Sequence, residues 1–525
     1  MSSLTSLQSG WLPLSTLAAG GVLALILLVK RLWPSPLRHV PGPPVLSFWH
    51  GNVANLFDPE HGFDYFQDVA REYGAVARLQ GAHGEDHLFV ADPRALHDIV
   101  IRNTDVWEIS DDIAERSRIV FGPGLFSAQG QEYKKQRRVL NRVFTPEYLR
   151  KLVPLFYTIS YHLRDVLSAQ IAQGKEDGKD IDVLNYISPY TPRDSPTISK
   201  LTTLRGWWPL ISRLRNLVPQ TWRDPLVRWI PSTLVQQLRE TIRALDESTT
   251  HIFAERRKAA AEGSVGNVDI MSTLIKLNNA ADPKDKMSEE ELVAQLSILV
   301  LTAQDTTAGA LARTLLLLAH HPDAQARLRA EIRAAKEEHC DELGYDQLLA
   351  LPWLDAICRE TLRVHTTAPM FPRIAKQDTV LPLLWPVKST NGTELNELVV
   401  PKGTPVHIAI HAANVEPRIW GADAHVWRPE RWTDAPLPKS VSDARLPGIY
   451  SNMMSFLGGP RACLGFRFSQ LEMKLILFVL LDTFSFAPAK AGDLDWHLCT
   501  TLSPHVRGKE ALGPMLPVRM SLLKE

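Results

Sequence analysis

The sequence predicts a mainly α-helical protein with a small β part, preceded by one N-terminal membrane-spanning helix. Three observations lead to this prediction. Residues 11–29 carry no charge, helical periodicity dominates the chain beyond residue 91, and only residues 75–79 and 87–91 read as strands. No internal repeat or low-complexity tract divides the chain, so we expect one large domain behind the membrane helix.

The composition limits the classes of partner. The chain has 525 residues, enough for a large buried core, and its 58 basic and 58 acidic side chains give a formal net charge of zero. Without a basic excess, the sequence offers no argument for a nucleic-acid partner. The spacing of the cysteines is neither paired nor that of a zinc knuckle, which argues against a disulfide scaffold and suits a reducing compartment. The cysteines are Cys340, Cys358, Cys463 and Cys499.

Residues 1–32 are predicted to form a membrane anchor. The uncharged stretch 11–29 approaches the roughly twenty residues needed to cross a bilayer. Lys30 and Arg31 follow it, whereas the first ten residues carry no basic side chain, which is the reverse of a cleaved signal peptide. A buried core helix is the alternative interpretation. The charge bias predicts a single-pass membrane protein with its main domain in the cytosol, and we expect it in the endoplasmic reticulum membrane.

A proline-rich segment, residues 33–45, follows the anchor and predicts a stiff, extended connector instead of a helix. Residues 46–525 then make up the main domain. The two predicted strands lie near its start, and helices follow. The segment 188–209 is predicted to be irregular, because Pro189, Pro192 and Pro196 would break any helix there.

A long helix is predicted from Ser288, where Ser-Glu-Glu-Glu forms a capping box, to His321, which precedes a proline. At 1.5 Å per residue it would be roughly 50 Å long. Asp305 and Thr306 follow an apolar stretch in its middle, where polar groups are costly unless they are paired or used. Such a pair can relay protons where bulk water is excluded. The structural alternative is a threonine bonded to its own helix and a salt-bridged aspartate.

A second helix is predicted from Pro352 to Val364. Its Glu360 and Arg363 are three residues apart and therefore share one face. Taken alone, such a pair is common and usually lies on a solvated surface.

Cys463 lies in a glycine-rich loop that reads Phe-Leu-Gly-Gly-Pro-Arg-Ala-Cys-Leu-Gly over residues 456–465. The glycines allow a tight turn and the close approach of a flat ligand. An apolar stretch, 466–481, is predicted to begin a helix at once, and a helix start favours a thiolate. A thiolate in such a loop is what an axial ligand to heme iron requires. The alternative is an inert, buried cysteine.

This loop resembles Phe-x-x-Gly-x-Arg-x-Cys-x-Gly, the heme-binding signature of the cytochrome P-450 monooxygenases, at every fixed position. Four further segments resemble motifs of that family in the same order along the chain. The resemblance implies the family fold, an α-rich triangular prism that holds heme b between the long helix and the Cys463 loop. The segments are 133–138, 302–307, 360–363 and 429–432.

The resemblance also implies roles for individual residues. Glu360, Arg363 and Arg431 would form a buried network that fixes the loop beneath the heme, and Asp305 and Thr306 would deliver protons. Thr302 and Ala303 replace the small pair that the family has before that aspartate. The residues implied to contact the heme are Tyr133, Arg137, Arg373, Phe456, Gly459, Arg461, Cys463 and Gly465.

The resemblance further implies a monooxygenase that oxidises an apolar small molecule with O₂. No G-x-G-x-x-G unit is present to hold a flavin or nicotinamide, so electrons are expected from a separate NADPH-cytochrome P450 reductase, docked on a basic helix face. That face comprises Lys134, Lys135, Arg138 and Arg142. Residues 455–481 look most like membrane-anchored fungal members of secondary metabolism, which suggests a terpenoid-like substrate.

Two alternatives of other classes remain open. A heme-thiolate isomerase or dehydratase would need neither O₂ nor a reductase, although Asp305 and Thr306 argue against it. A membrane heme protein without catalysis would take up no electrons from a reductase.

Overall fold

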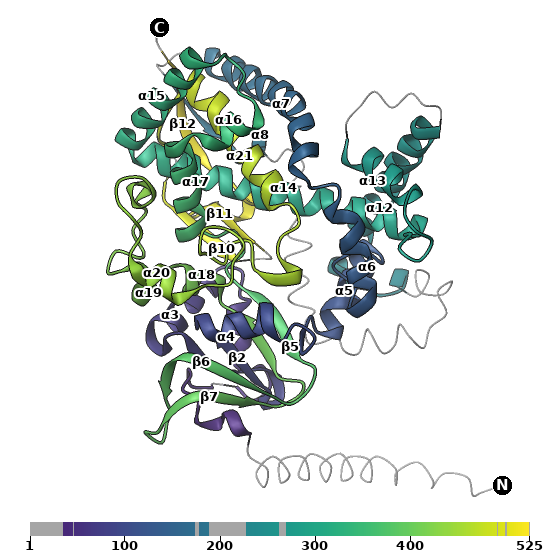
Figure 1. Cartoon of the computed structure of the whole chain (residues 1–525), viewed down its shortest axis with the longest axis vertical. Coiled ribbons are helices and arrows are strands. Elements are labelled where there is room, and N and C mark those ends of the chain that lie inside the picture. The colour runs from purple at the N-terminus through teal and green to yellow at the C-terminus, as the bar shows by residue number, and fades with distance from the viewer. Residues whose placement is uncertain are drawn as a thin grey trace, which may run out of the picture.

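The computed structural model describes residues 35–45, 47–173, 178–187, 227–261, 269–490, 492–498 and 501–523. Helices are the main regular structure of this part of the chain, and the strands form only small sheets, as the sequence predicts. In Figure 1 most of the helices lie in the upper and right parts of the molecule, and the five-stranded sheet and the β6-β7 pair lie below them. The α-helices are α2 Val53–Leu56, α3 Gly62–Tyr73, α4 Pro93–His97, α5 Asp111–Phe121, α6 Gly130–Asn141, α7 Pro146–Ala172, α8 Leu184–Ile187, α12 Thr233–Ala261, α13 Ile270–Asn279, α14 Glu289–His320, α15 Pro322–Glu338, α16 Tyr345–Ala350, α17 Pro352–Val364, α18 Ile410–Asn414, α19 Pro417–Trp420, α20 Lys439–Ala444 and α21 Phe466–Thr483.

The strands form four small sheets, in the orders β1-β2-β8-β5-β3, β4-β12-β9, β6-β7 and β10-β11. The two predicted strands are confirmed as an antiparallel pair in which Val76 lies opposite Val90. The parallel pairing of β2 with β8 joins segments more than 300 residues apart, with Leu88 opposite Val406. The strands are β1 Val76–Gln80, β2 Asp86–Val90, β3 Trp107–Glu108, β4 Lys179–Asp182, β5 Phe371–Ala375, β6 Thr379–Lys388, β7 Glu394–Val400, β8 Pro405–Ile408, β9 Phe484–Pro488, β10 Leu494–Leu498, β11 Leu502–Val506 and β12 Pro517–Leu522.

Two hydrophobic cores organise the described residues. The larger core is formed by apolar side chains of α7, α14, α15, α17 and α21, and the smaller one lies around the five-stranded sheet. The long helix α14 runs through the middle of the view in Figure 1, with α21 drawn beside it. Although α14 is packed on several sides, none of residues 299–306 in its middle is fully buried.

The predicted helix boundaries agree closely with the structure. Ser288 caps α14, its side chain accepts from the Glu291 backbone, and the Glu291 carboxylate accepts from the Ser288 backbone. Pro352 occupies the first turn of α17, where its missing N–H costs nothing. Both helices therefore begin where the sequence places a cap or a proline.

The connector prediction is corrected in part, because Pro36–His39 forms a 3₁₀ turn. The Ser35 hydroxyl accepts from the Leu37 backbone, and proline is tolerated in a first helical turn. Leu37 and Val40 are buried in the smaller core, so this segment is packed against the domain.

The predicted anchor and the predicted irregular segment 188–209 lie outside the described residues. Within the described ranges, no helix is both long enough and apolar enough to cross a bilayer. The anchor, and with it the division at residues 32 and 45, stays a prediction.

Candidate active site

The Cys463 loop is held by close backbone packing. Cβ atoms at Gly458 and Gly459 would lie 1.9 Å from the Pro447 carbonyl oxygen and 1.7 Å from that of Val100, and Gly459 has a φ of +67°. No other residue type fits these two positions. The Cys463 N–H donates to the Phe456 carbonyl at 2.9 Å, which closes the loop ahead of α21.

The Cys463 side chain faces open space. The residue is exposed, and a Cβ at Gly465 would meet no atom within 4 Å. Ala303, in the middle of α14, is also exposed although its helix crosses the core. The sulfur loop thus has an open side, and α14 has an exposed position in its middle, as a site for a flat group between the two would require.

Although its side chain borders open space, Cys463 lies deep among the residues that surround it, and this desolvation raises the pKa of the thiol by disfavouring the thiolate. The Gly465 N–H and the charge of Arg137 lower this pKa, but by less. The expectation that the helix start alone would favour a thiolate is therefore not met. A metal ion that replaces the proton would supply the missing positive charge.

Of the residues predicted to contact the heme, some already have partners within the protein and others do not. Arg461 pairs with Glu108 at 2.8 Å and lies over the Tyr133 ring, and the Tyr133 hydroxyl donates to the Pro460 carbonyl at 2.9 Å. Arg373 is buried, and among the described residues it donates only to the carbonyl of its neighbour Pro372. Burial lowers the pKa of Arg373 to about 10, helped by the nearby charge of Arg461.

Arg137 forms no ion pair with any residue that the structure describes, although it is half-buried. It lies close enough to Cys463 to affect the pKa of the thiol. Arg137 and Arg373 are therefore the two guanidinium groups at this site that could bind carboxylates of a ligand.

The middle of α14 carries the predicted proton relay. The Thr306 hydroxyl donates to the Thr302 carbonyl at 2.7 Å, so the back-bonding expected in the structural alternative is present. The salt bridge that the structural alternative also expects is absent among the described residues, because Asp305 pairs with none of them. Burial raises the pKa of Asp305.

Glu472, on α21, is a site residue that the sequence analysis missed. Its carboxyl group hydrogen-bonds Thr307, and its Oε2 atom has no partner in the described part of the chain. Burial raises the pKa of Glu472 to about 7, although the Thr307 contact lowers it. The sequence feature that could have revealed Glu472 is its position as the single acid within the apolar stretch that follows Cys463.

The predicted three-residue network is present and buried. Arg363 binds both carboxylate oxygens of Glu360, at 2.8 and 2.9 Å, and the Nε of Arg431 binds Glu360 at 3.3 Å. Trp432 was not predicted to take part, yet its indole N–H donates to Glu360 at 2.9 Å. Every oxygen of the carboxylate is therefore bound, which is what a buried charge requires.

The network reaches the Cys463 loop through Asn414. Arg363 donates to the Asn414 carbonyl, and the Asn414 side chain bonds both the Met454 N–H and the Ser455 hydroxyl. Ser455 directly precedes Phe456, the carbonyl acceptor of Cys463. The position of the sulfur thus depends on the Glu360 network through a chain of hydrogen bonds.

The sulfur loop, the buried arginines and the polar centre of α14 define a heme-thiolate protein. Comparison with known proteins supports this class. The Cytochrome P450 family model matches residues 40–193 and 210–505. The chain is 38% identical to cytochrome P450 monooxygenase 91 of Postia placenta, over 95% of this chain and 96% of that protein. It is 34% identical to ganoderic acid synthetase CYP5150L8 of Ganoderma lucidum, over 90% and 92%.

The chain belongs to the cytochrome P450 family and is a monooxygenase. Members bind heme b through a cysteine thiolate, use O₂ and a redox partner, and act on small molecules. The residues present fit that group, because an exposed sulfur faces open space, and Arg137 and Arg373 form no ion pair with any residue that the structure describes. When bound, heme supplies the activation of O₂. Cys463 would hold the iron, and Arg137 and Arg373 would hold the heme carboxylates.

Proposed function

We propose that this monooxygenase hydroxylates or otherwise oxidises an apolar, terpenoid-like small molecule in secondary metabolism. The observation that carries the proposal is the apolar surface beside the middle of α14. Val300 on α14 and Phe126 in the loop after α5 are 44% and 39% exposed, although both are large and apolar. That loop packs directly on α14, since a Cβ at Gly124 would lie 2.4 Å from Ile298. An apolar surface at such a site suits a substrate with few polar groups.

Other apolar side chains in and just before this loop are consistent with this class. Phe121 and Phe126 make an edge-to-face contact at 6.1 Å, and Leu125 is buried beneath them. Ganoderic acid synthetase, one of the similar proteins, is named for an acid that it makes. That name supports secondary metabolism as the setting for this chain.

Within the chain itself, Asp305, Thr306 and Glu472 are the groups that can hold or move protons. Two of them are carboxyl groups whose pKa burial raises, so each can carry a proton nearer neutral pH than an exposed acid. The Thr306 hydroxyl can accept a proton from one side and give one on the other. We assign Asp305 and Thr306 the relay, as the sequence suggested.

The electron donor in this proposal is a membrane-bound NADPH-cytochrome P450 reductase, reached from a domain on the cytosolic face of the endoplasmic reticulum. Its predicted docking face is less basic than the sequence suggested. Lys135 pairs with Glu291 at 2.8 Å, Arg138 with Asp285 at 2.6 Å and Lys134 with Asp105 at 3.4 Å.

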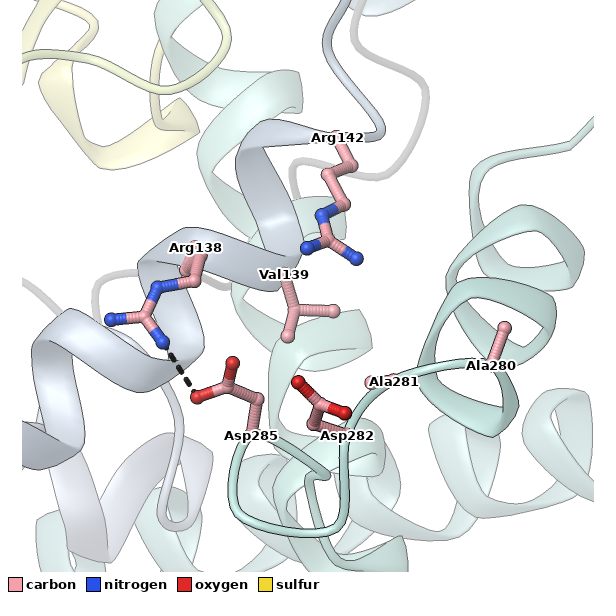
Figure 2. Close-up of a pocket in the computed structure, with 7 residues that line it drawn as sticks. All are labelled: Arg138, Val139, Arg142, Ala280, Ala281, Asp282 and Asp285. Carbon is pink, nitrogen blue, oxygen red and sulfur yellow. Dashed lines mark hydrogen bonds and ion pairs between the residues drawn. The ribbon is translucent and has the colours of Figure 1, made fainter.

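Arg142 is the one of these four cations that pairs with no described residue. Figure 2 shows it across a small pocket from Asp282, with the Arg138–Asp285 ion pair on the other side. An acidic donor would meet Arg142 first, because the other three charges are already compensated.

The test is turnover in membranes that contain the full chain and the reductase, with a library of apolar terpenoid skeletons. The proposal expects oxygenated product that depends on NADPH. Product formed without NADPH would favour the isomerase or dehydratase. A protein that accepts no electrons from the reductase would favour a heme protein without catalysis.

A further inference from the structure

Arg313 is a deeply placed cation that neither the relay nor the heme site uses. It lies on α14, seven residues after Thr306. Seven residues are almost two helical turns, so the two side chains leave the same side of α14, roughly 10 Å apart along its axis. Arg313 therefore belongs to the face of α14 that bears the oxygen-activating residues.

The guanidinium of Arg313 has an aromatic partner but no anion. It lies over the Trp496 ring of β10, 3.2 Å from the ring centroid, and its Nε donates to no described group. The acids of the same hairpin, Asp493 and Asp495, bind Arg507 instead. No described carboxylate pairs with Arg313.

The other titratable groups around Arg313 add no negative charge. Burial and neighbouring arginines, Arg313 among them, lower the pKa of His365 and of His411, the latter to about 3. Both imidazoles are therefore neutral at physiological pH. The remaining neighbour, Arg363, is bound to Glu360.

The Arg313 site is not sealed, because Arg313, Trp496 and His365 each keep part of their surface accessible. The guanidinium itself is largely removed from bulk water, which lowers its pKa well below the usual value and makes a cation without a counterion costly. An uncompensated charge of this kind, next to a functional site, indicates an anionic ligand.

We propose that Arg313 binds the carboxylate of an apolar substrate acid, with Trp496 covering one face of the guanidinium. The proposal rests on the proposed monooxygenase function and names the substrate class more closely. The edge of a guanidinium matches a carboxylate with two parallel hydrogen bonds, and an indole stacked on its face leaves that edge free. The carboxylate would lie roughly 10 Å from Thr306, so oxidation would occur at a carbon remote from the acid group.

The test is a spectroscopic binding titration of the full-length, heme-loaded protein. The probes are carboxylic acids and the matching primary alcohols on three skeletons: a linear fatty chain, a tricyclic diterpene and a tetracyclic triterpene. For at least one skeleton, the acid should bind roughly 10- to 100-fold more tightly than the alcohol, as expected for a hydrogen-bonded charge pair. Arg313→Gln should abolish this preference and leave the affinity for the alcohol unchanged, and Arg313→Lys should retain part of it.

Equal affinity for acid and alcohol on all three skeletons in the wild type would overturn the proposal, and this comparison needs no variant. A preference that persists in Arg313→Gln would also overturn it. If Arg313→Gln does not load heme, Trp496→Leu serves as the second variant, with a reduced acid preference expected. Failure of the proposed function looks different, because then no apolar compound, acid or alcohol, perturbs the heme spectrum.

Discussion

The Glu472 carboxyl group hydrogen-bonds Thr307, and this contact joins α21 to α14 one residue beyond the predicted relay threonine. The helix α21 begins three residues after Cys463 and packs against α14. Glu472 is thus a titratable group between the helix that follows the sulfur loop and the helix that carries Asp305 and Thr306.

The raised pKa of Glu472 predicts a specific dependence of stability on pH. An acid with a pKa of about 7 in the folded state and about 4.5 in the unfolded state holds its proton more tightly when folded. The folded state then binds more protons between these values, so stability falls as pH rises from about 4.5 to 7, by up to about 3 kcal/mol. Urea unfolding of wild type and Glu472→Gln across this range measures the effect. If the free energy of unfolding changed equally with pH in the wild type and in Glu472→Gln, the raised pKa of Glu472 would be contradicted.

Glu360→Ala is expected to lose heme. The substitution leaves Arg363 and Arg431 buried without their shared carboxylate, at a cost of about 3–5 kcal/mol, and releases the hydrogen-bond chain to Ser455. The heme-to-protein ratio after purification and the free energy of unfolding report the two effects. Glu247→Ala is the matched control, because it breaks an exposed pair with Arg243. A Glu360→Ala protein with a full complement of heme would argue against the network's role.

Thr306→Val tests the relay. The change keeps the branched shape and removes the hydroxyl, so NADPH should still be consumed while product per NADPH falls at least about tenfold. Thr306→Ser should keep most of the yield. Thr314→Val is the control, because the Thr314 hydroxyl makes the same back-bond, to Ala310 at 2.8 Å, two turns further along α14. Equal loss of yield in both valine variants would show a general effect on the helix.

Arg142→Glu tests the electron-donor surface. Reversal of the uncompensated charge should raise the KM for the reductase several-fold at low ionic strength, and added salt should narrow the difference, because such attraction is screened. Steady-state NADPH oxidation against reductase concentration measures this. Arg71→Glu, an exposed arginine on α3 that pairs with Asp68, is the control. No change in KM for Arg142→Glu would place the donor elsewhere.

The sequence predicted the elements whose ends carry local signals. The Ser288 capping box, Pro352 and the glycines before Cys463 act on their own neighbours, so the boundaries of α14, α17 and the sulfur loop could be predicted from short stretches. The three-residue network was predicted because its members lie in ordered motifs.

Contacts between distant segments were not predicted, because local patterns carry no information about them. The parallel pairing of β2 with β8, the Arg461–Glu108 ion pair and the contact of Glu472 with Thr307 all join segments from different parts of the chain. The raised pKa of the Cys463 thiol was also not predicted, because it too depends on contacts between distant segments. The helix start was visible in the sequence, but the burial that outweighs it comes from the packed domain.

The central claim is that Cys463 binds the heme iron through its sulfur. The most direct measurement is the absorption spectrum of the reduced, carbon-monoxide-bound full-length protein, with Cys463→His as the comparison. The account predicts the long-wavelength Soret band of a thiolate-ligated heme in the wild type and its loss in the variant. A wild-type spectrum like that of a histidine-ligated globin, from folded and heme-loaded protein, would contradict it.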